Sequence, residues 1–255
     1  MNESIDSKSE KTRQFYDAAA AIIRDLSFMN YGYAPLATPL GDSAGPERYC
    51  LELYAHLLGD AELRGRQVLE ISCGRGGGAS FAMARYGPRS LVGIDLSERN
   101  IDSAARRFAG VNGLSFLVGK SERLPFASSS YDAVINVEAS HLYDDPARFF
   151  FEVRRVLRSG GVFFYADLFW STSDPLQLIT DAGLSVTSNE DITANVLQSL
   201  DLDCARREQL ITAAVPEHLQ RDYRDWSGIK GHRAYNRFAS REWVYRSFRA
   251  AIQPR

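Results

Sequence analysis

A short apolar run that ends in a glycine-rich turn carries the residues best suited to chemistry. The run Val68–Ile71 leads directly into Ser72-Cys73-Gly74-Arg75-Gly76-Gly77-Gly78. Glycines in such a turn accept positive φ angles and let the backbone approach a ligand closely. About 20 residues later a second apolar run ends in Gly93-Ile94-Asp95, where a carboxylate can meet ribose hydroxyls. The two features together predict a nucleoside cofactor.

The residues around the turn narrow the choice of nucleoside. A glycine-rich turn occurs in many Rossmann-like proteins, and a dinucleotide-binding turn is the alternative interpretation. Glu70 stands just ahead of the turn, and at about 4 Å its charge would repel a pyrophosphate by a kilocalorie or more. The later segment Gly119–Phe126, after the third apolar run, also does not suit a dinucleotide site. S-adenosylmethionine (SAM) has an amino-acid tail with a positive charge, which favours this cofactor.

An acid–base pair is predicted at the ends of two further strands. His141 follows the fourth apolar run and Asp167 lies at the end of the fifth. In a parallel sheet these strand ends are neighbours and open on the cofactor crevice. A histidine can take the proton of a hydroxyl group while a carboxylate orients it. The alternative is that His141 packs against the cofactor and Asp167 bonds to neighbouring backbone.

The chain alternates short apolar runs with helical patterns, which is typical of repeated βαβ units and a parallel sheet. Strands are predicted at Gln67–Ile71, Ser90–Asp95, Leu114–Val118, Tyr131–Val137 and Val162–Leu168. Helices are predicted between them near Gly78–Tyr86, Arg99–Phe108 and Ala147–Leu157. Beyond Trp170 we expect a short helix at Pro175–Ala182 and strands at Leu184–Ser188 and Trp243–Ile252.

Additional segments are predicted on both sides of this core. Apolar residues from Phe15 to Leu26 recur at helical spacing and predict a helix of about 15 residues, followed by a loop to Pro46 and a helix near Glu47–Leu58. The mainly helical stretch Ile192–Tyr235 resembles a lid over a substrate. We therefore divide the chain into an N-terminal helix and cap segment (1–46), a cofactor-binding core (47–190), a helical lid (191–240) and a final core strand (241–255).

Composition limits the partners. The 255 residues are 45% hydrophobic and 24% charged, with a formal net charge of −2. This balance gives no basic surface for nucleic acid, so a small-molecule substrate is expected. No apolar stretch approaches the roughly 20 residues of a membrane span, and the amino terminus is polar, so we predict a cytoplasmic protein without membrane insertion. Both a monomer and a homodimer fit the sequence.

No metal is predicted to be required. The three cysteines are widely spaced, and reduced thiols are the expected state. Asp144-Asp145 precedes Pro146 and is interpreted as a helix cap rather than a metal site. The basic pair Arg206-Arg207 is expected on a solvated helix face.

The chain resembles the class I SAM-dependent methyltransferases. The resemblance spans about residues 63–168 and is carried by VLEISCGRGGG, GIDLSERNI, GKSERLPF, YDAVINVEASH and VRRVLRSGGVFFYADL, in this order. The segments EISCGRGGG and NVEASHLY look closest to small-molecule O-methyltransferases of bacterial lipid and polyketide biosynthesis, such as the phthiotriol dimycocerosate methyltransferases. The resemblance implies an α/β, Rossmann-like fold: a seven-stranded, mostly parallel sheet with an antiparallel last strand, helices on both faces and a helical lid.

The resemblance also implies roles for individual residues. The methionine portion of SAM is assigned to Glu70, Ser72, Cys73, Gly74 and Gly76, with Asn136 beneath it. The adenosine portion is assigned to Asp95 and Asn100 at the ribose and to Leu96, Ser121 and Glu122 at the adenine. Ser72 departs from a usual glycine, and Lys120 stands where an aspartate commonly meets the adenine amino group; a lysine cannot accept that hydrogen bond.

Aromatic side chains complete the predicted site. Tyr16 and Tyr33 are expected to cap the cofactor from the N-terminal segment, because their amphipathic rings suit a partly wet wall. Tyr143 and Trp170 lie next to strand ends and are expected to line the acceptor pocket.

The predicted reaction is methyl transfer from SAM to a hydroxyl group of a polyketide, lipid or glycoside, with S-adenosylhomocysteine as the product. Two alternatives stay open: N-methylation of a small amine, and a non-methylating cyclase with the same fold. A nucleic-acid methyltransferase is disfavoured because NVEASH stands where an Asn-Pro-Pro-Tyr-like motif would follow the fourth strand.

Overall fold

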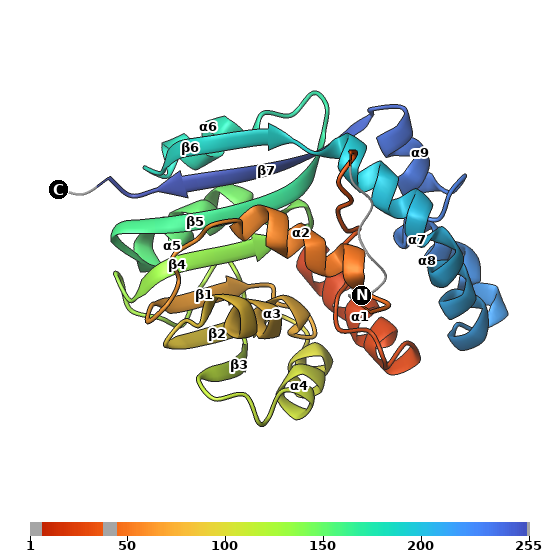
Figure 1. Cartoon of the computed structure of the whole chain (residues 1–255), viewed down its shortest axis with the longest axis horizontal. Helices are drawn as coiled ribbons and strands as arrows, with labels where there is room; N and C mark the ends of the chain where they lie inside the picture. Colours follow the sequence, from red (N-terminus) through yellow and green to blue (C-terminus); the bar gives the residue numbers. More distant parts are fainter. Residues whose placement is uncertain (1–6, 38–44, 254–255) are drawn as a thin grey trace, which may run out of the picture.

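A seven-stranded sheet forms the centre of the computed structural model, which describes residues 7–37 and 45–253 (Figure 1). The strand order is β3-β2-β1-β4-β5-β7-β6. Strands β1 to β5 run parallel, and β7 is antiparallel to both of its neighbours. The strands are β1 (Gln67–Ile71), β2 (Ser90–Asp95), β3 (Leu114–Val118), β4 (Tyr131–Val137), β5 (Leu157–Trp170), β6 (Ser185–Asp191) and β7 (Trp243–Ala251). This confirms the predicted fold class.

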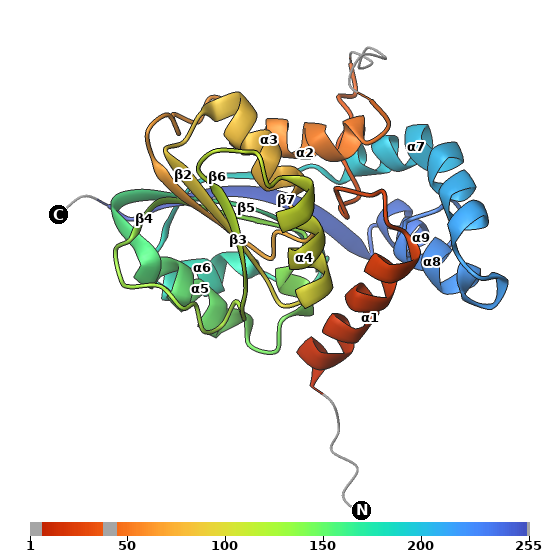
Figure 2. The ribbon, with the colours of Figure 1, turned by 90° about the horizontal axis from the view of Figure 1, so that it is seen from below.

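Helices cover both faces of the sheet, α2 and α3 on one and α5 and α6 on the other (Figure 2). The α-helices are α1 (Lys8–Ile22), α2 (Arg48–Leu58), α3 (Gly77–Tyr86), α4 (Glu98–Arg107), α5 (Pro146–Val156), α6 (Pro175–Asp181), α7 (Thr193–Ala214), α8 (Gln220–Trp226) and α9 (Arg233–Ala239). Short 3₁₀ turns, η2 (Ser140–Leu142) and η3 (Glu217–Leu219), follow β4 and precede α8. Because successive side chains of a strand point to opposite faces, the sheet builds two separate apolar cores.

The first four strands have the bounds that the sequence predicts, whereas β5 and β6 are longer. β5 starts at Leu157, which pairs with Tyr131, and runs to Trp170, which pairs with Trp243 of β7. β6 extends to Asp191 because its polar second half also pairs with β7. These extensions carry no alternation of apolar residues, so they depend on the neighbouring strand rather than on local sequence.

The N-terminal helix lies earlier in the chain than the sequence predicts. α1 starts at Lys8, after Ser7, whose side chain accepts a hydrogen bond from the amide of Glu10. It ends at Ile22, and the carbonyls of Ile23 and Leu26 accept hydrogen bonds from the buried guanidinium of Arg75 instead of continuing the helix. The predicted loop is present at 31–37, and its part at 38–44 lies outside the described residues.

The helical segment α7–α9 and α1 pack together beside the carboxyl ends of the strands (Figure 1). Arg207 on α7 is buried, not solvated as predicted, and its guanidinium donates to the carbonyls of Asn30 and Tyr31. The helical segment α7–α9 and the N-terminal segment are therefore joined by hydrogen bonds. The domain boundaries drawn from the sequence stay a prediction.

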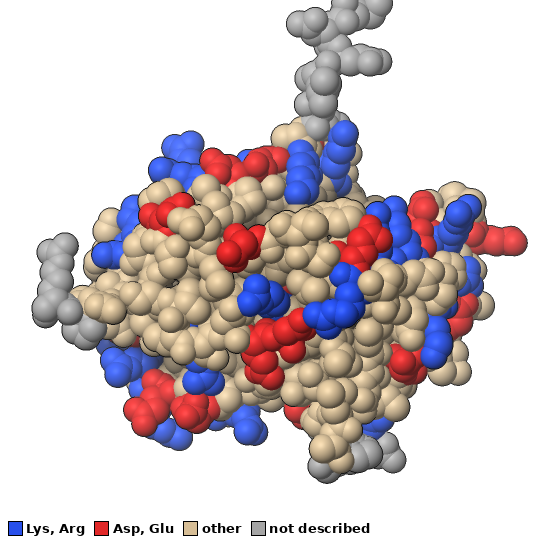
Figure 3. Space-filling view, turned by 90° about the horizontal axis from the view of Figure 1, so that it is seen from above, with Lys and Arg blue, Asp and Glu red and all other residues tan. Residues whose placement is uncertain are grey.

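Surface charge is mixed on the face shown in Figure 3, where Lys and Arg side chains alternate with Asp and Glu. This distribution agrees with the small net charge of −2. Within residues 7–37 and 45–253, no helix has both the length and the apolar character that a membrane crossing requires.

The contact between α2 and α3 yields a stability prediction. A Cβ atom on Gly78 of α3 would lie 2.1 Å from the ring of Tyr54, a buried residue of α2 whose hydroxyl donates to Glu70. We expect Gly78→Ala to lower the free energy of unfolding by about 1–3 kcal/mol, since overpacking outweighs the better helix propensity of alanine. Gly110→Ala is the control, because a Cβ there meets nothing within 4 Å. Urea unfolding of the two variants checks this; equal midpoints would contradict it.

Candidate active site

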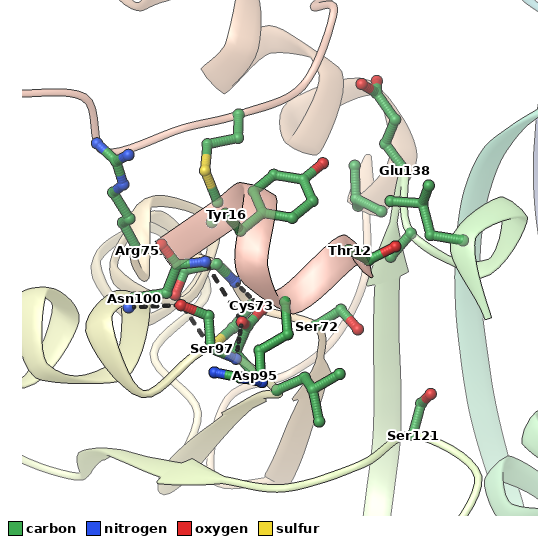
Figure 4. A pocket seen from close by; sticks show the side chains of 18 of the residues that line it. Thr12, Tyr16, Ser72, Cys73, Arg75, Asp95, Ser97, Asn100, Ser121 and Glu138 are labelled. Carbon is green, nitrogen blue, oxygen red and sulfur yellow. Dashed lines mark hydrogen bonds between the residues drawn. The ribbon is translucent and has the colours of Figure 1, made fainter. Parts of the chain in front are cut away.

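A cleft opens where the carboxyl ends of β1, β2 and β4 meet, and α1 and residues 27–30 form part of its wall. It encloses about 870 Å³ when its open mouth is counted. Figure 4 shows side chains from the glycine-rich turn, the end of β2 and α1 around one space. The predicted site residues that line it are Tyr16, Ser72, Cys73, Gly74, Asp95, Leu96, Asn100, Ser121, Glu122 and Tyr143. Residues far apart in sequence are thus brought together.

The glycine-rich turn after β1 has left-handed backbone at Ser72, Gly74 and Gly76, with φ angles of 57°, 53° and 79°. This conformation explains why glycine is usual at the position of Ser72, since an L-residue there costs about 1–2 kcal/mol. The Ser72 hydroxyl lies 2.7 Å from the hydroxyl of Tyr143, an interaction that glycine cannot make. Ser72 therefore costs backbone strain, but its hydroxyl adds a hydrogen bond between the turn after β1 and the segment after β4.

Asp95 joins the ends of β1 and β2. Its Oδ2 accepts from the Gly74 amide at 2.9 Å, and its Oδ1 accepts from the Ser97 amide at 2.9 Å and the Asn100 side-chain amide at 3.3 Å (Figure 4). Burial raises the pKa of Asp95 although these hydrogen bonds oppose the shift. A carboxylate offers about four acceptor positions, so Asp95 keeps one for a ligand. Asn100 Oδ1 is buried without a partner in the described part of the chain.

Glu70 lies behind the turn rather than on the cleft wall. Its Oε1 accepts a hydrogen bond of 2.7 Å from Tyr54, which does line the cleft, and its Oε2 is buried with no partner among the described residues. Burial raises the pKa of Glu70 from 4.5 to about 8, and the nearby charge of Asp95 adds to the shift. The hydrogen bonds from Tyr54 and the backbone of Ala79 oppose this shift, and Oε2 is the weakly satisfied acceptor beside the cleft.

The rim of the cleft near Lys120 is closed by charged hydrogen bonds. The Lys120 ammonium lies 2.9 Å from Asp144, which also accepts from the backbone and hydroxyl of Ser9 on α1. Glu122 accepts from the Ser121 hydroxyl at 2.7 Å and from the amide of Asp144 at 3.1 Å. These bonds fix α1 against the segments after β3 and β4. The predicted helix cap is confirmed at Asp145, which accepts from the amide of Arg148 at the start of α5.

His141, in the η2 turn after β4, and Asp167, three residues before the end of β5, form a pair. Nδ1 of His141 lies 2.7 Å from Oδ1 of Asp167, and Oδ2 accepts from the Ser140 hydroxyl and the His141 amide. The Asp167 side chain is fully buried. Burial acts to raise its pKa, but the charge and hydrogen bond of His141 and the Ser140 hydroxyl outweigh burial and lower it. The carboxylate thus stays ionised and orients the imidazole.

A second cavity of about 620 Å³, open solvent included, adjoins the cleft. Four of its nine lining residues are aromatic, and Lys11, Glu138 and His141 are among the polar ones. Thr12, Tyr16, Glu138 and Leu142 line both spaces, so the two cavities meet at these residues. The full lining is Lys11, Thr12, Phe15, Tyr16, Tyr31, Glu138, His141, Leu142 and Trp226.

Comparison with known proteins gives the family. The sequence profile of a family described as "Methyltransferase domain" matches residues 69–165. The fatty-acid O-methyltransferase of Mycolicibacterium smegmatis is 32% identical over 97% of this chain and 91% of that protein. The phthiotriol/phenolphthiotriol dimycocerosates methyltransferase of Mycobacterium tuberculosis is 36% identical over 88% of this chain and 84% of that protein.

The chain belongs to the class I SAM-dependent methyltransferases. Its fold is also that of the crystal structure of the [4+2]-cyclase SpnF, with a TM-score of 0.75, 17% identity and coverage of 97% of both chains. SAM is the cofactor of this methyltransferase. The site fits its charged tail, because unpartnered acceptor oxygens of Glu70 and Asn136 are buried around the turn after β1.

Two predicted residues of the methyltransferase lie away from both cavities. Tyr33 stacks on His56 with ring centroids 4.1 Å apart, because residues 33 and 34 run along α2 and α7 rather than over the cleft. Trp170 is 48% exposed and packs against Trp243 and Arg237 at the far end of β5. The extension of β5 beyond Leu168 carries Trp170 past the site, so both predicted placements are wrong.

Three further predicted residues support the cleft without lining it. Glu70 does so through Tyr54, and Gly76 starts α3 against the ring of Phe116. Asn136 donates to the carbonyl of Ile71 and to the hydroxyl of Tyr143. They hold the residues that form the wall.

The main residue that sequence reasoning missed is Glu138, which lines both cavities. It directly follows β4 within the NVEASH segment, at the same sheet edge as Asp95. A carboxylate directly after a predicted strand could therefore have identified Glu138 as a candidate site residue. Thr12 and Trp226 carry no such signal, because only the packing of α1 and α8 brings them to the site.

The raised pKa of Glu70 predicts a pH dependence of stability. Between its ordinary value of 4.5 and about 8, the folded protein holds a proton that the unfolded chain releases. The stability contributed by this proton is complete below the lower value and is lost as the pH rises to the upper one. Glu70→Gln should therefore flatten the fall in unfolding free energy between about pH 5 and pH 8.5. The exposed Glu62→Gln should keep the wild-type slope; unchanged slopes in both variants would refute the assignment.

Proposed function

We propose that this methyltransferase transfers the methyl group of SAM to a hydroxyl group of a lipid or related natural product. The observation that carries the proposal is the His141–Asp167 pair, with 2.7 Å between Nδ1 and Oδ1, in which Asp167 is fully buried and His141 lines a cavity that adjoins the cleft. The names of the relatives, a fatty-acid O-methyltransferase and a phthiotriol methyltransferase, support acceptors of this kind.

The cleft residues would hold SAM through its charged and polar ends. Asp95 would accept from the ribose diol with its remaining lone pair, and the unpartnered Asn100 Oδ1 supplies a second acceptor. The turn 72–76 would hold the methionine portion. Glu70 would lie at short range from the ammonium group, whose positive charge would favour the ionised form of the carboxyl group, with Tyr54 as the group in contact. Tyr16 of α1 would close the cleft beside the methyl group.

Leu96 and Ser121 would border the adenine, and Lys120 is not an acceptor for its amino group. The ammonium of Lys120 is engaged with Asp144, and Glu122 already binds Ser121 and backbone amides. Glu122 is therefore better suited to positioning the residues at this end of the cleft than to forming a hydrogen bond with the adenine. Backbone carbonyls are left to recognise the adenine amino group.

The chain contributes position and a base to the reaction. Bound SAM supplies a methyl group on a positively charged sulfur. When Nδ1–H of His141 donates to Asp167, Nε2 keeps its lone pair. Because His141 lines the second cavity, Nε2 would accept the hydroxyl proton there as the oxygen forms its bond to the methyl carbon and the bond from that carbon to sulfur breaks. The ionised Asp167 stabilises the imidazolium that results. Holding the acceptor in line with the methyl group supplies the larger part of the rate.

The prediction is that His141→Ala lowers methyl transfer to alcohols by about 10²–10⁴-fold, because the general base is lost. Asp167→Asn should also lower kcat, because the amide can turn the imidazole to the wrong tautomer. Neither variant should change the affinity for S-adenosylhomocysteine. Mass spectrometry of methylated products from a panel of alcohols, fatty acids and amines, with calorimetry for the cofactor, measures both quantities.

His232→Ala provides a matched control, since His232 also faces a carboxylate, Asp225, at 3.3 Å but lies outside both cavities. It should keep wild-type activity. Methylation of amines alone would replace the hydroxyl assignment by N-methylation. Tight cofactor binding without methylation of any acceptor would favour a non-methylating enzyme.

A further inference from the structure

Glu138 stands where the cofactor cleft and the second cavity meet. It follows β4 directly, lines both spaces and has a left-handed backbone with φ of 53°. In Figure 4 its carboxyl group points away from the cluster around Asp95, on the other side of Tyr16. Strained non-glycine residues persist where surrounding contacts over-determine them, and they gather at functional sites. The proposed methylation of a hydroxyl group does not assign a role to Glu138.

The carboxyl group of Glu138 is held by one oxygen and leaves the other open. Oε2 accepts from the amide of Tyr31 at 2.9 Å and from the hydroxyl of Tyr245 at 3.0 Å, and both tyrosines are buried. Oε1 has no hydrogen-bond partner in the described part of the chain and is not sealed off from the cavities. A carboxyl group fixed in this way presents one defined hydrogen-bonding position to a ligand.

The ligand that reaches this position is the acceptor rather than the cofactor. Glu138 and His141 line the same cavity and are three residues apart, so their Cα atoms are at most about 11 Å apart. Between and around them the walls are the rings of Phe15, Tyr31 and Trp226. An acceptor whose reacting oxygen meets His141 therefore occupies a cavity whose wall also carries the carboxyl group of Glu138.

We propose that Glu138 binds a second hydroxyl group of the acceptor, next to the one that is methylated, and so selects diol-bearing apolar molecules over simple alcohols. This deepens the proposed function and depends on His141 facing the reacting hydroxyl. A hydroxyl fits because it can donate to the carboxylate or accept from the protonated carboxyl. Burial raises the pKa of Glu138 to about 8, so near neutral pH the carboxyl group can take either form, and each form can bond a hydroxyl.

Direct binding tests this independently of catalysis. Calorimetry on the protein loaded with S-adenosylhomocysteine compares decane-1,2-diol with decan-1-ol and decan-2-ol, which share its chain but have one hydroxyl each. We expect wild type to prefer the diol by about tenfold, the value of one well-made hydrogen bond of about 1.4 kcal/mol. Glu138→Leu should abolish the preference by weakening diol binding only, and Glu138→Gln should keep part of it while preserving the bonds from Tyr31 and Tyr245. Glu62→Gln should match wild type.

The outcomes separate this inference from the function on which it builds. Equal affinities for diol and mono-alcohols in wild type, or a preference that persists in Glu138→Leu, overturn the role of Glu138. Loss of S-adenosylhomocysteine affinity in Glu138→Gln would assign the residue to the cofactor instead, and likewise overturns it. If wild type binds the diol preferentially through Glu138 but methylates no alcohol, the proposed reaction fails while the acceptor subsite stands. In active wild type, Glu138→Gln should raise KM for the diol and leave kcat nearly unchanged.

Discussion

The hydrogen bond from the Gly74 amide to Asp95 is the contact on which the site depends. It joins the turn after β1 to the end of β2 at 2.9 Å, and the turn can reach Asp95 only because its backbone is left-handed at Ser72 and Gly74. The same carboxylate organises the start of α4 through Ser97 and Asn100. One carboxylate thus holds both the turn after β1 and the start of α4 in place.

The segment that follows α1, residues 23–37, has no regular secondary structure. Its backbone groups therefore need hydrogen-bond partners from elsewhere in the chain. Four charged side chains provide them, of which Arg75 and Arg207 are buried and Glu47 and Glu138 are partly buried. Cationic groups take carbonyls and carboxylates take amides: Arg75 binds Ile23 and Leu26, Arg207 binds Asn30 and Tyr31, Glu47 binds Ser27 and Phe28, and Glu138 binds Tyr31. These four side chains come from the glycine-rich turn, the lid, the start of α2 and the end of β4. The position of this segment therefore depends on all four of these parts of the chain.

The parts that the sequence predicted are those fixed by local pattern. Strands β1 to β4 alternate or concentrate apolar residues over their exact lengths, and the glycine turn and Asp95 follow from strand ends. The errors arise where distant contacts decide. α1 stops at Ile22 because Arg75 takes the next carbonyls, Trp170 moves away because β7 prolongs β5, and Tyr33 lies on His56. The spacing of residues in the sequence does not predict these contacts, because their partners are far apart in the chain.

The cleft and the second cavity differ in the same way, because one is formed by local strand-end structure and the other by contacts between distant helices. The cleft is built from the sheet edge and its turns, so a change in its residues disturbs strand ends and the core beneath them. The second cavity is closed by side chains of α1 and α8, where Phe15 and Tyr16 pack edge-on against Trp226 at 5.4 and 6.0 Å. Substitutions in these helices can reshape the acceptor space while the hydrogen bonds of Asp95 stay intact. Glu138 and His141, which also line this cavity, follow β4 at the sheet edge. In the proposed reaction the reacting end of the acceptor would therefore be held by the same frame as the cofactor, and the rest of the acceptor would meet α1 and α8.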